Sequence, residues 1–191
     1  LEMTSQKWRD YSDLDKPIWT HYLTIIKPNT LATDTAMLWI DGGSTSSSPT
    51  SQMDDILAII ATSTNSVVAN IRMVPNQPLQ FTGETRTRSE DAIIAYSFDK
   101  YMTTSDPNWP VLLPMTKSAV RAMDTVQDFL YNMPINPVNI NDFVVAGASK
   151  RGWTTWLTAA VDTRVKAIVP AVIDVLNIDK QMLHHLAAYG F

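Results

Sequence analysis

The 191-residue sequence contains no cysteine. A disulfide framework, a thiol nucleophile and a thiolate-bound metal ion are therefore excluded within it. The histidines and carboxylates also lack the regular spacing of a metal-binding motif, so we expect neither a metal ion nor another cofactor. Because exported proteins can lack cysteine as well, this absence leaves the cellular compartment open.

Basic residues are also scarce, with 15 Lys and Arg against 19 Asp and Glu and a sequence pI near 5.2. We therefore expect no basic surface that would hold a nucleic-acid backbone or an anionic membrane. No apolar run approaches the roughly 20 residues that a membrane-spanning helix needs. The first residues include Glu2, Lys7 and Arg9 where a signal peptide would be apolar, so we expect no transmembrane segment and no leader in this sequence.

The remaining composition, 45% hydrophobic and 18% charged, is typical of a globular protein, and the length favours a single domain over residues 1–191. Apolar runs of strand and helix type alternate along it, which predicts an α/β fold with a mostly parallel sheet and helices on both faces. The predicted strands are His21–Ile26, Ala36–Ile40, Ser66–Met73, Phe143–Ala146 and Val165–Val172. The later strands are continuously apolar, so we expect them to be covered on both faces. The predicted helices are Met53–Thr62, Glu90–Tyr101 and Thr116–Tyr131.

The most informative segment runs from Phe143 to Trp153, where an apolar strand leads through Gly147 and Ser149 into a helix. A nucleophilic serine on a sharp strand-to-helix turn projects its hydroxyl above the sheet. The usual pattern is Gly-x-Ser-x-Gly, but Arg151 holds the second glycine's place and Gly152 follows one residue later. The alternative is that Ser149 is a helix N-cap and that Gly147 merely turns the chain.

A serine hydrolase also needs backbone N–H groups to stabilise the oxyanion. One would come from Lys150, the residue after the nucleophile. The second would come from Gly43 or Ser44, in the loop that follows the strand Ala36–Ile40. The alternative for this loop is a flexible turn into a serine-rich segment.

A serine also needs a base, normally a histidine that a carboxylate orients. His21 precedes the serine, which does not match the chain order of Ser, acid and His in this fold. Asp174 with His184 or His185 would complete a set within the chain, but the helical pattern of 180–189 favours ordinary helix histidines. Few residues follow Ser149, so we expect the chain to stop before the C-terminal strands of the fold.

Three further groups of residues have two interpretations each. Asn76 and Gln77 lie between two prolines and would either bind a ligand or form a self-satisfied turn. Glu90-Asp91 would either orient an arginine (Arg72, Arg86 or Arg88) or sit at a helix N-terminus for its dipole, and we favour the dipole. Lys150 and Arg151 would either attract an acidic substrate or pair with carboxylates such as Asp124 and Asp174. Trp153 and Trp156, three residues apart, are expected in the core.

Dense motifs beyond the serine turn extend along nearly the whole chain. They are Thr4-Ser5-Gln6-Lys7-Trp8, Val74-Pro75-Asn76-Gln77-Pro78-Leu79, Glu90-Asp91-Ala92-Ile93-Ile94-Ala95-Tyr96, Pro114-Met115-Thr116-Lys117, Gly147-Ala148-Ser149-Lys150-Arg151-Gly152-Trp153 and Arg164-Val165-Lys166-Ala167-Ile168-Val169-Pro170. In these motifs the sequence resembles the PhoPQ-activated pathogenicity-related protein family, which includes secreted autocrine proliferation repressor proteins.

This resemblance implies an α/β-hydrolase-like domain with Ser149 in the nucleophile position and Gly152 at the family's own spacing. It also implies that the triad acid and histidine lie beyond Phe191, and that the protein is secreted or periplasmic. The resemblance suggests two functions: hydrolysis of an ester or amide bond in a small molecule or peptide, or signalling through a cell-surface receptor on a hydrolase scaffold. The fold alone does not decide between them.

Overall fold

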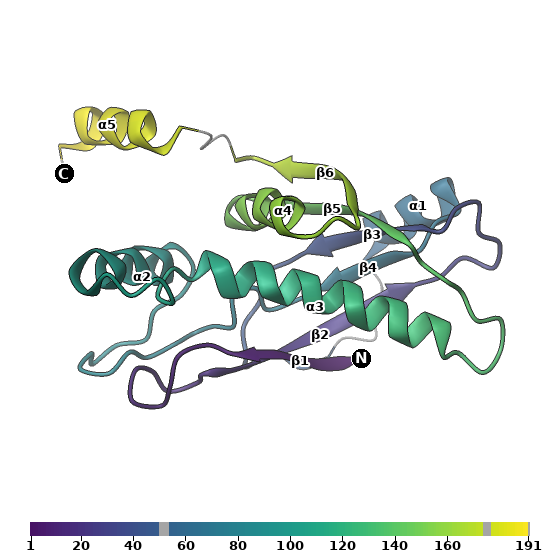
Figure 1. Ribbon diagram of the computed structural model, residues 1–191, viewed down its shortest axis with the longest axis horizontal. Coiled ribbons are helices and arrows are strands. Elements are labelled where there is room, and N and C mark those ends of the chain that lie inside the picture. Colours follow the sequence, from purple (N-terminus) through teal and green to yellow (C-terminus); the bar gives the residue numbers. More distant parts are fainter. Residues whose placement is uncertain (50–53, 174–176, 191) are drawn as a thin grey trace.

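A computed structural model of the chain describes residues 1–49, 54–173 and 177–190. These residues form a six-stranded sheet with the strand order β1-β2-β4-β3-β5-β6 (Figure 1). The strands are β1 (Glu2–Lys7), β2 (Ile18–Ile26), β3 (Thr35–Ile40), β4 (Val68–Ile71), β5 (Asp142–Ala148) and β6 (Val165–Ala171). The helices are α1 (Asp55–Thr64), α2 (Asp91–Thr104), α3 (Leu112–Tyr131), α4 (Lys150–Val161) and α5 (Ile178–Tyr189).

Strand direction divides the sheet into two parts. β1 and β4 each pair antiparallel with β2, whereas β4, β3, β5 and β6 run parallel to one another. The predicted α/β class with a mostly parallel sheet is therefore confirmed. Because parallel strands end at the same edge of a sheet, the segments that follow β3, β4, β5 and β6 meet there, and this edge is where open α/β sheets bind ligands.

Side chains alternate between the two faces of β3, as the twofold period of a strand requires. Ala36, Leu38 and Ile40 are buried in the main core, against the face that α3 and α4 contact. Met37 and Trp39 point to the opposite face and pack in a smaller cluster with α1. Helices thus cover both faces, as the sequence predicted.

The main core includes a group of aromatic rings beyond the antiparallel end of the sheet. Trp8 and Trp19 meet edge to face with ring centroids 5.6 Å apart, and Phe81 stacks on Tyr96 at 3.9 Å. Trp109 contacts both Trp8 and Phe81. These rings connect β1 and β2 to α2 and to the segment before α3, so the N-terminal strands belong to the same core as the helices.

Several sequence predictions are corrected by the structure. β1 was not predicted because its polar sequence lacks a clear apolar alternation, although Met3, Ser5 and Gln6 are buried. β6 was expected to be covered on both faces, but it is the last strand of the described sheet and Val169 is exposed. A proline within it, Pro170, is the kind of residue that edge strands tolerate.

Helical predictions differ from the structure mainly at the ends. α3 starts at Leu112, four residues before the predicted helix, with Pro114 in its first turn, where a proline is tolerated. In α4, Trp153 packs against the core as expected, but Trp156 is exposed, so its assignment to the core was wrong.

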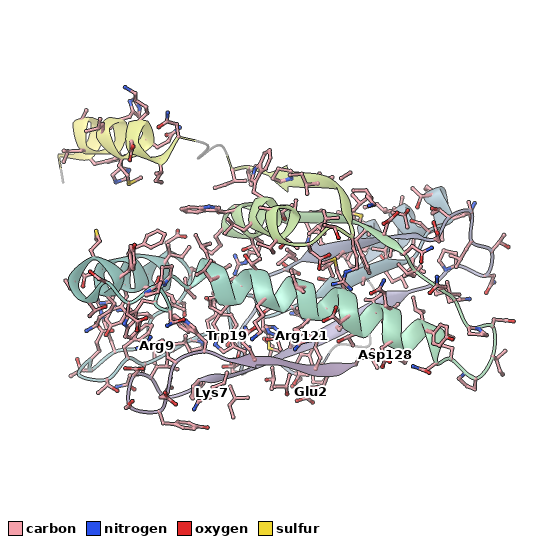
Figure 2. All side chains as sticks on the ribbon, viewed as in Figure 1. Glu2, Lys7, Arg9, Trp19, Arg121 and Asp128 are labelled. Atoms are coloured by element: carbon pink, nitrogen blue, oxygen red, sulfur yellow. The ribbon has the colours of Figure 1, made fainter. Side chains whose placement is uncertain are left out.

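The predicted helical pattern near the end of the chain is confirmed as α5, but this helix has no buried residue. Figure 2 shows its side chains projecting away on all sides, with no other element beside them. Apolar side chains such as Met182, Leu183 and Leu186 are therefore exposed. None of the helices in the described part of the chain is both long and apolar enough to cross a membrane.

Candidate functional site

Ser149 occupies the turn between β5 and α4, at the carboxyl edge of the parallel strands. Its backbone has φ 55° and ψ −125°, a strained combination for a residue with a side chain. The neighbouring strand helps to hold this conformation, because the Ser149 N–H donates to the carbonyl of Ala171 at 2.9 Å. This geometry is typical of the nucleophile elbow of α/β-hydrolases.

The hydroxyl of Ser149 does not cap the helix. Ser149 stands at the N-cap position of α4, yet its side chain makes no capping hydrogen bond. Its exposed hydroxyl has no hydrogen-bond partner among the residues that the structure describes. The alternative interpretation of Ser149 as a helix cap is therefore wrong with respect to its side chain, and the hydroxyl is available to a ligand.

Two glycines allow the first turn of α4 to pass close to β5. A Cβ atom on Gly147 would lie 2.7 Å from the carbonyl oxygen of Arg151, and one on Gly152 would lie 3.0 Å from the carbonyl oxygen of Gly147. Both distances are shorter than an ordinary contact. Gly152, and not position 151, thus provides the space that the second glycine of the usual motif provides.

Arg151 connects three segments at the edge of the sheet. Its Nε donates to the carbonyl oxygen of Val74 at 2.6 Å, beyond the end of β4. Its two terminal nitrogens donate to the two carboxylate oxygens of Glu90 at 2.7 and 2.8 Å, a bidentate ion pair. The guanidinium also lies against Gly42, where a Cβ atom would be only 2.9 Å from Nη2. The side chain therefore stabilises the turn.

Glu90 is the common partner of both cations beside Ser149. The Lys150 ammonium lies 2.5 Å from Glu90 Oε2 and 3.0 Å from Asp91 Oδ1. Burial opposes ionisation of Glu90, but hydrogen bonds from Arg151, Lys150 and Gln77 outweigh it and lower the pKa of Glu90 to about 2. The alternative that the two cations pair with carboxylates is thus confirmed, but Asp124 was the wrong partner, since it pairs with Arg121 and Arg164. Asp174 lies outside the described residues.

This contact also corrects the interpretation of Glu90 itself. We favoured a role at the helix dipole, and Glu90 does precede α2, but its side chain makes no capping bond there. Its backbone has φ 55° and ψ −130°, nearly the same strained conformation as Ser149. It does orient an arginine, although Arg151 was not among the three that the sequence suggested. Asp91 does lie in the first turn of α2, as the dipole favours.

Asn76 and Gln77 are almost fully buried within the protein's own hydrogen bonds. The Asn76 amide donates to the carbonyl of Thr20 at 2.5 Å. Gln77 donates to the carbonyl of Gly43 at 3.1 Å and to Glu90 at 2.5 Å, and its oxygen accepts from the Glu90 N–H at 2.7 Å. This arrangement favours the self-satisfied turn over direct ligand binding, and Gln77 links the loop after β3 to Glu90.

The predicted oxyanion donors lie at the same edge of the sheet. Ile40 of β3 pairs with Gly147 of β5. Gly43 lies three residues after Ile40, and Lys150 lies three residues after Gly147. Lys150 is the first residue of α4, where a backbone N–H has no partner within the helix. Among the described residues no acceptor is found for the N–H of either Gly43 or Lys150. Their role as oxyanion donors remains a prediction.

None of the described histidines forms a hydrogen bond or an ion pair with Ser149. His21 is fully buried between Ser5 Oγ at 2.8 Å and the carbonyl of Arg72 at 3.0 Å, and burial lowers its pKa to about 4. His184 and His185 are exposed on α5. Neither of them contacts Ser149 among the described residues, and Asp174 lies outside those residues, so the set of Ser149, Asp174 and His184 stays a prediction.

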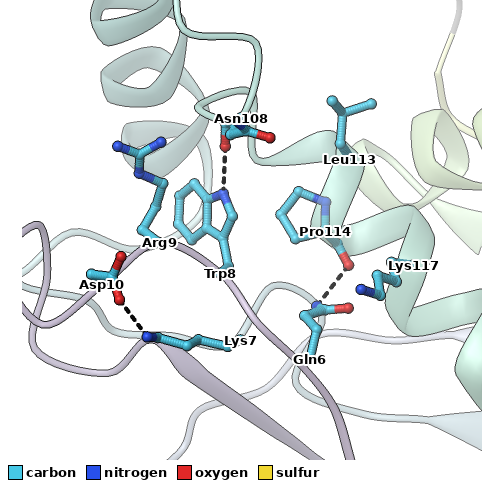
Figure 3. A pocket seen from close by; sticks show the side chains of 9 residues that line it. All are labelled: Gln6, Lys7, Trp8, Arg9, Asp10, Asn108, Leu113, Pro114 and Lys117. Carbon is cyan, nitrogen blue, oxygen red and sulfur yellow. Dashed lines mark hydrogen bonds and ion pairs between the residues drawn. The ribbon is translucent and has the colours of Figure 1, made fainter.

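A separate hollow of about 480 Å³ lies between the end of β1 and the start of α3 (Figure 3). Trp8 and Gln6 lie along its floor, and both donate hydrogen bonds to backbone carbonyls across it. Lys7 pairs with Asp10, and Arg9 pairs with Asp13 and Asp106. Most of its charge is therefore neutralised within the protein, and the described residues hold no cluster of metal-binding side chains there or elsewhere.

Comparisons with known proteins agree with this architecture. The sequence profile of the PhoPQ-activated pathogenicity-related protein family matches residues 1–191. Autocrine proliferation repressor protein A of Dictyostelium discoideum is 42% identical over 192 residues, which cover 100% of this chain and 38% of that protein. The chain thus spans well under half of that relative's length.

Among solved structures, the chain is similar to acetyl xylan esterase 1 from a Thermoanaerobacterium species, with a TM-score of 0.51 and 14% identity. The match covers 98% of this chain and 61% of the esterase chain. At this identity the similarity concerns the fold alone. It confirms the predicted α/β-hydrolase-like architecture.

Proposed function

The chain belongs to the PhoPQ-activated pathogenicity-related protein family, and we propose that it is the nucleophile-bearing part of a secreted or periplasmic serine hydrolase. One observation carries this proposal: the strained turn that presents the Ser149 hydroxyl, exposed and unpaired among the described residues, at the carboxyl edge of a parallel sheet. Strain of this kind persists only where the surroundings enforce it, and it is common at active sites.

In the proposed reaction, Ser149 Oγ attacks the carbonyl carbon of an ester or amide while a histidine takes its proton. The N–H groups of Lys150 and Gly43 stabilise the negative oxygen of the tetrahedral intermediate. The histidine then returns the proton to the leaving alcohol or amine, which departs and leaves an acyl-serine. Water hydrolyses this ester by the same steps and regenerates the hydroxyl. Apart from this water, the steps described use side chains and backbone groups of the protein.

Two sources of the acid and base fit the proposal. The first is a carboxylate and a histidine in a longer gene product, in keeping with the 38% share of the relative that this chain covers. The second is Asp174 with His184, which predicts hydrolysis by residues 1–191 alone. An inactive but folded 191-residue chain would remove the second source.

A second candidate function is a secreted signal that binds a cell-surface receptor and limits proliferation. The 42% identity to a protein named as an autocrine proliferation repressor favours it. Both functions are compatible with one scaffold. The Ser149→Ala variant distinguishes the two functions, because it would keep receptor-mediated activity but lose hydrolysis.

The test is intact-mass detection of a fluorophosphonate adduct on the full-length gene product, with the 191-residue chain alongside. We expect one adduct on the wild type and none on Ser149→Ala. Circular dichroism of both proteins serves as the folding control. A folded wild type that takes up no probe would reject the hydrolase and leave the receptor-binding signal.

A further inference from the structure

Two cations, Lys150 and Arg151, follow Ser149 directly in sequence, and an enzyme with free cations at this place would attract anionic substrates. The structure shows that neither cation is free. We infer that Glu90 is a specificity-determining residue, which neutralises Lys150 and Arg151 and thereby makes the site select uncharged acyl groups over anionic ones. This inference rests on the proposed function of Ser149.

Burial and hydrogen bonding keep both cationic side chains away from a ligand. The Lys150 side chain is 8% exposed, and its ammonium contacts Glu90 and Asp91. The Arg151 side chain is 12% exposed, and its donors are directed to Glu90 and to the carbonyl of Val74. An acyl group on Ser149 would therefore meet an ammonium and a guanidinium that are nearly buried and already paired with carboxylates.

The carboxylates balance the cations in number. Lys150 and Arg151 contribute two positive charges, and Glu90 and Asp91 contribute two negative charges. Glu90 is ionised throughout the physiological range, since its three hydrogen-bond donors hold its pKa far below neutrality. Asp91 is 86% exposed, so the charge of this group that is most accessible to solvent is negative. An anionic group in the acyl chain would therefore be repelled by the Asp91 carboxylate rather than bound by the cations.

Glu90 is also fixed in place and cannot readily leave the cations. Gln77 bonds both its backbone N–H and its carboxylate. Its backbone has a positive φ of 55° before the first residue of α2, and its carboxylate is held by Arg151 and Lys150. Moving Glu90 away would leave the nearly buried Arg151 without a carboxylate and Lys150 with only the exposed Asp91, which is unfavourable. The neutral state of the site is thus built into the fold.

The experiment compares two fluorophosphonates of equal chain length on the full-length gene product, one ending in a methyl group and one in a carboxylate. The measured quantity is the ratio of their second-order labelling rates at Ser149. We expect the wild type to prefer the neutral probe. In Glu90→Gln the ratio should shift toward the anionic probe by about three- to tenfold, as expected when one unit of negative charge is removed from a partly solvated site. The shift should shrink at high salt.

Two further variants make the test specific. Glu84→Gln removes the carboxylate of another Arg–Glu pair, with Arg88, away from the elbow, and should leave the ratio unchanged. Asp91→Asn removes a carboxylate that is 86% exposed and leaves Glu90 as the partner of Lys150. It should shift the ratio in the same direction as Glu90→Gln but by less, and it serves in place of Glu90→Gln if that variant does not fold.

The outcomes distinguish a failure of the inference about Glu90 from a failure of the proposed function of Ser149. A wild type that labels equally fast with both probes would overturn the inference and leave Ser149 as a nucleophile. The same holds if Glu90→Gln and Asp91→Asn slow both probes equally, because Glu90 would then be only structural. If neither probe labels the folded protein, the proposed function fails and the inference fails with it.

Discussion

Replacing Gly147 by alanine tests the closest approach in the elbow. The added Cβ would lie 2.7 Å from the carbonyl oxygen of Arg151 and 2.8 Å from its carbonyl carbon. Both are backbone atoms of the first turn of α4, so no side-chain rotation relieves the contact. The helix must move away from β5, and Ser149 between them must move with it.

The expected loss follows from two opposing effects. Overpacking in a close-packed site costs about 1–3 kcal/mol, whereas replacing a glycine within a strand returns about 0.5–1 kcal/mol of backbone entropy. The difference spans about 0–2.5 kcal/mol, and since the contacted atoms are backbone atoms that cannot rotate away, we expect Gly147→Ala to lower the free energy of unfolding by about 1–2 kcal/mol. A loss of this size lowers the melting temperature by about 2–4 °C per kcal/mol in a domain of this length.

Gly152→Ala is the matched comparison in the same turn. Its nearest contact is 2.5 Å to Ile173 Cγ2, on a half-buried residue beyond the end of β6 that can shift more easily than the core, and the backbone oxygens of Gly147 and Ala171 follow at 3.0 and 3.1 Å. We expect a smaller loss than for Gly147→Ala.

The assay is urea unfolding followed by the fluorescence of the 6 tryptophans, with the midpoint expected to fall at unchanged slope. Two results would refute the steric reasoning: a Gly147→Ala protein within about 0.5 kcal/mol of the wild type, the usual range of harmless surface changes, or a larger loss in Gly152→Ala.

Three further predictions concern single side chains. Burial lowers the pKa of His21 to about 4 from its ordinary 6.5, so the stability that the neutral imidazole contributes is present above pH 6.5 and is lost, by up to about 3 kcal/mol, as pH falls to 4. Between pH 7 and 4.5, urea unfolding should show a smaller loss of stability for His21→Gln than for the wild type. Equal losses would contradict this. Ser149→Gly should be about 1 kcal/mol more stable than Ser149→Ala in thermal unfolding, because glycine relieves the strain at φ 55°; equal stability would mean that the turn is not strained. Glu90→Gln should cost about 1–2 kcal/mol at pH 7, a value reduced because Glu90 is 40% exposed. Since the pKa of Glu90 is lowered from 4.5 to about 2, this stabilisation is present above pH 4.5 and is lost as pH falls to 2, and a cost that is the same at pH 7 and pH 2.5 would argue against the ion pair.

The sequence allowed prediction of those features that depend on neighbouring residues. The apolar run before Gly147 and the helical pattern after Ser149 were enough to place the serine on a strand-to-helix turn. Gly42 and Gly43 were recognised as the loop after a strand for the same reason. These local patterns fix the element type because a strand and a helix have different apolar periods.

The charge pairing of the site could not be predicted in this way. Glu90 and Arg151 are separated by 61 positions, and their contact depends on the order in which the strands are placed in the sheet. Asp124 was an equally reasonable partner by charge, but it lies on α3, beside Arg121 and Arg164. β1 escaped prediction because its burial arises from α3 packing on it, not from an apolar sequence.

The close contact between Gly42 and Arg151 also restricts the order in which this protein can change during evolution. A methyl group at position 42 would lie 2.9 Å from the Arg151 guanidinium, so alanine there is harmful while the arginine is present. Loss of the arginine comes first, but it leaves Glu90 with Lys150 as its remaining cation. Descendants with alanine at position 42 therefore have to pass through a less stable ancestor, in which the arginine is already lost.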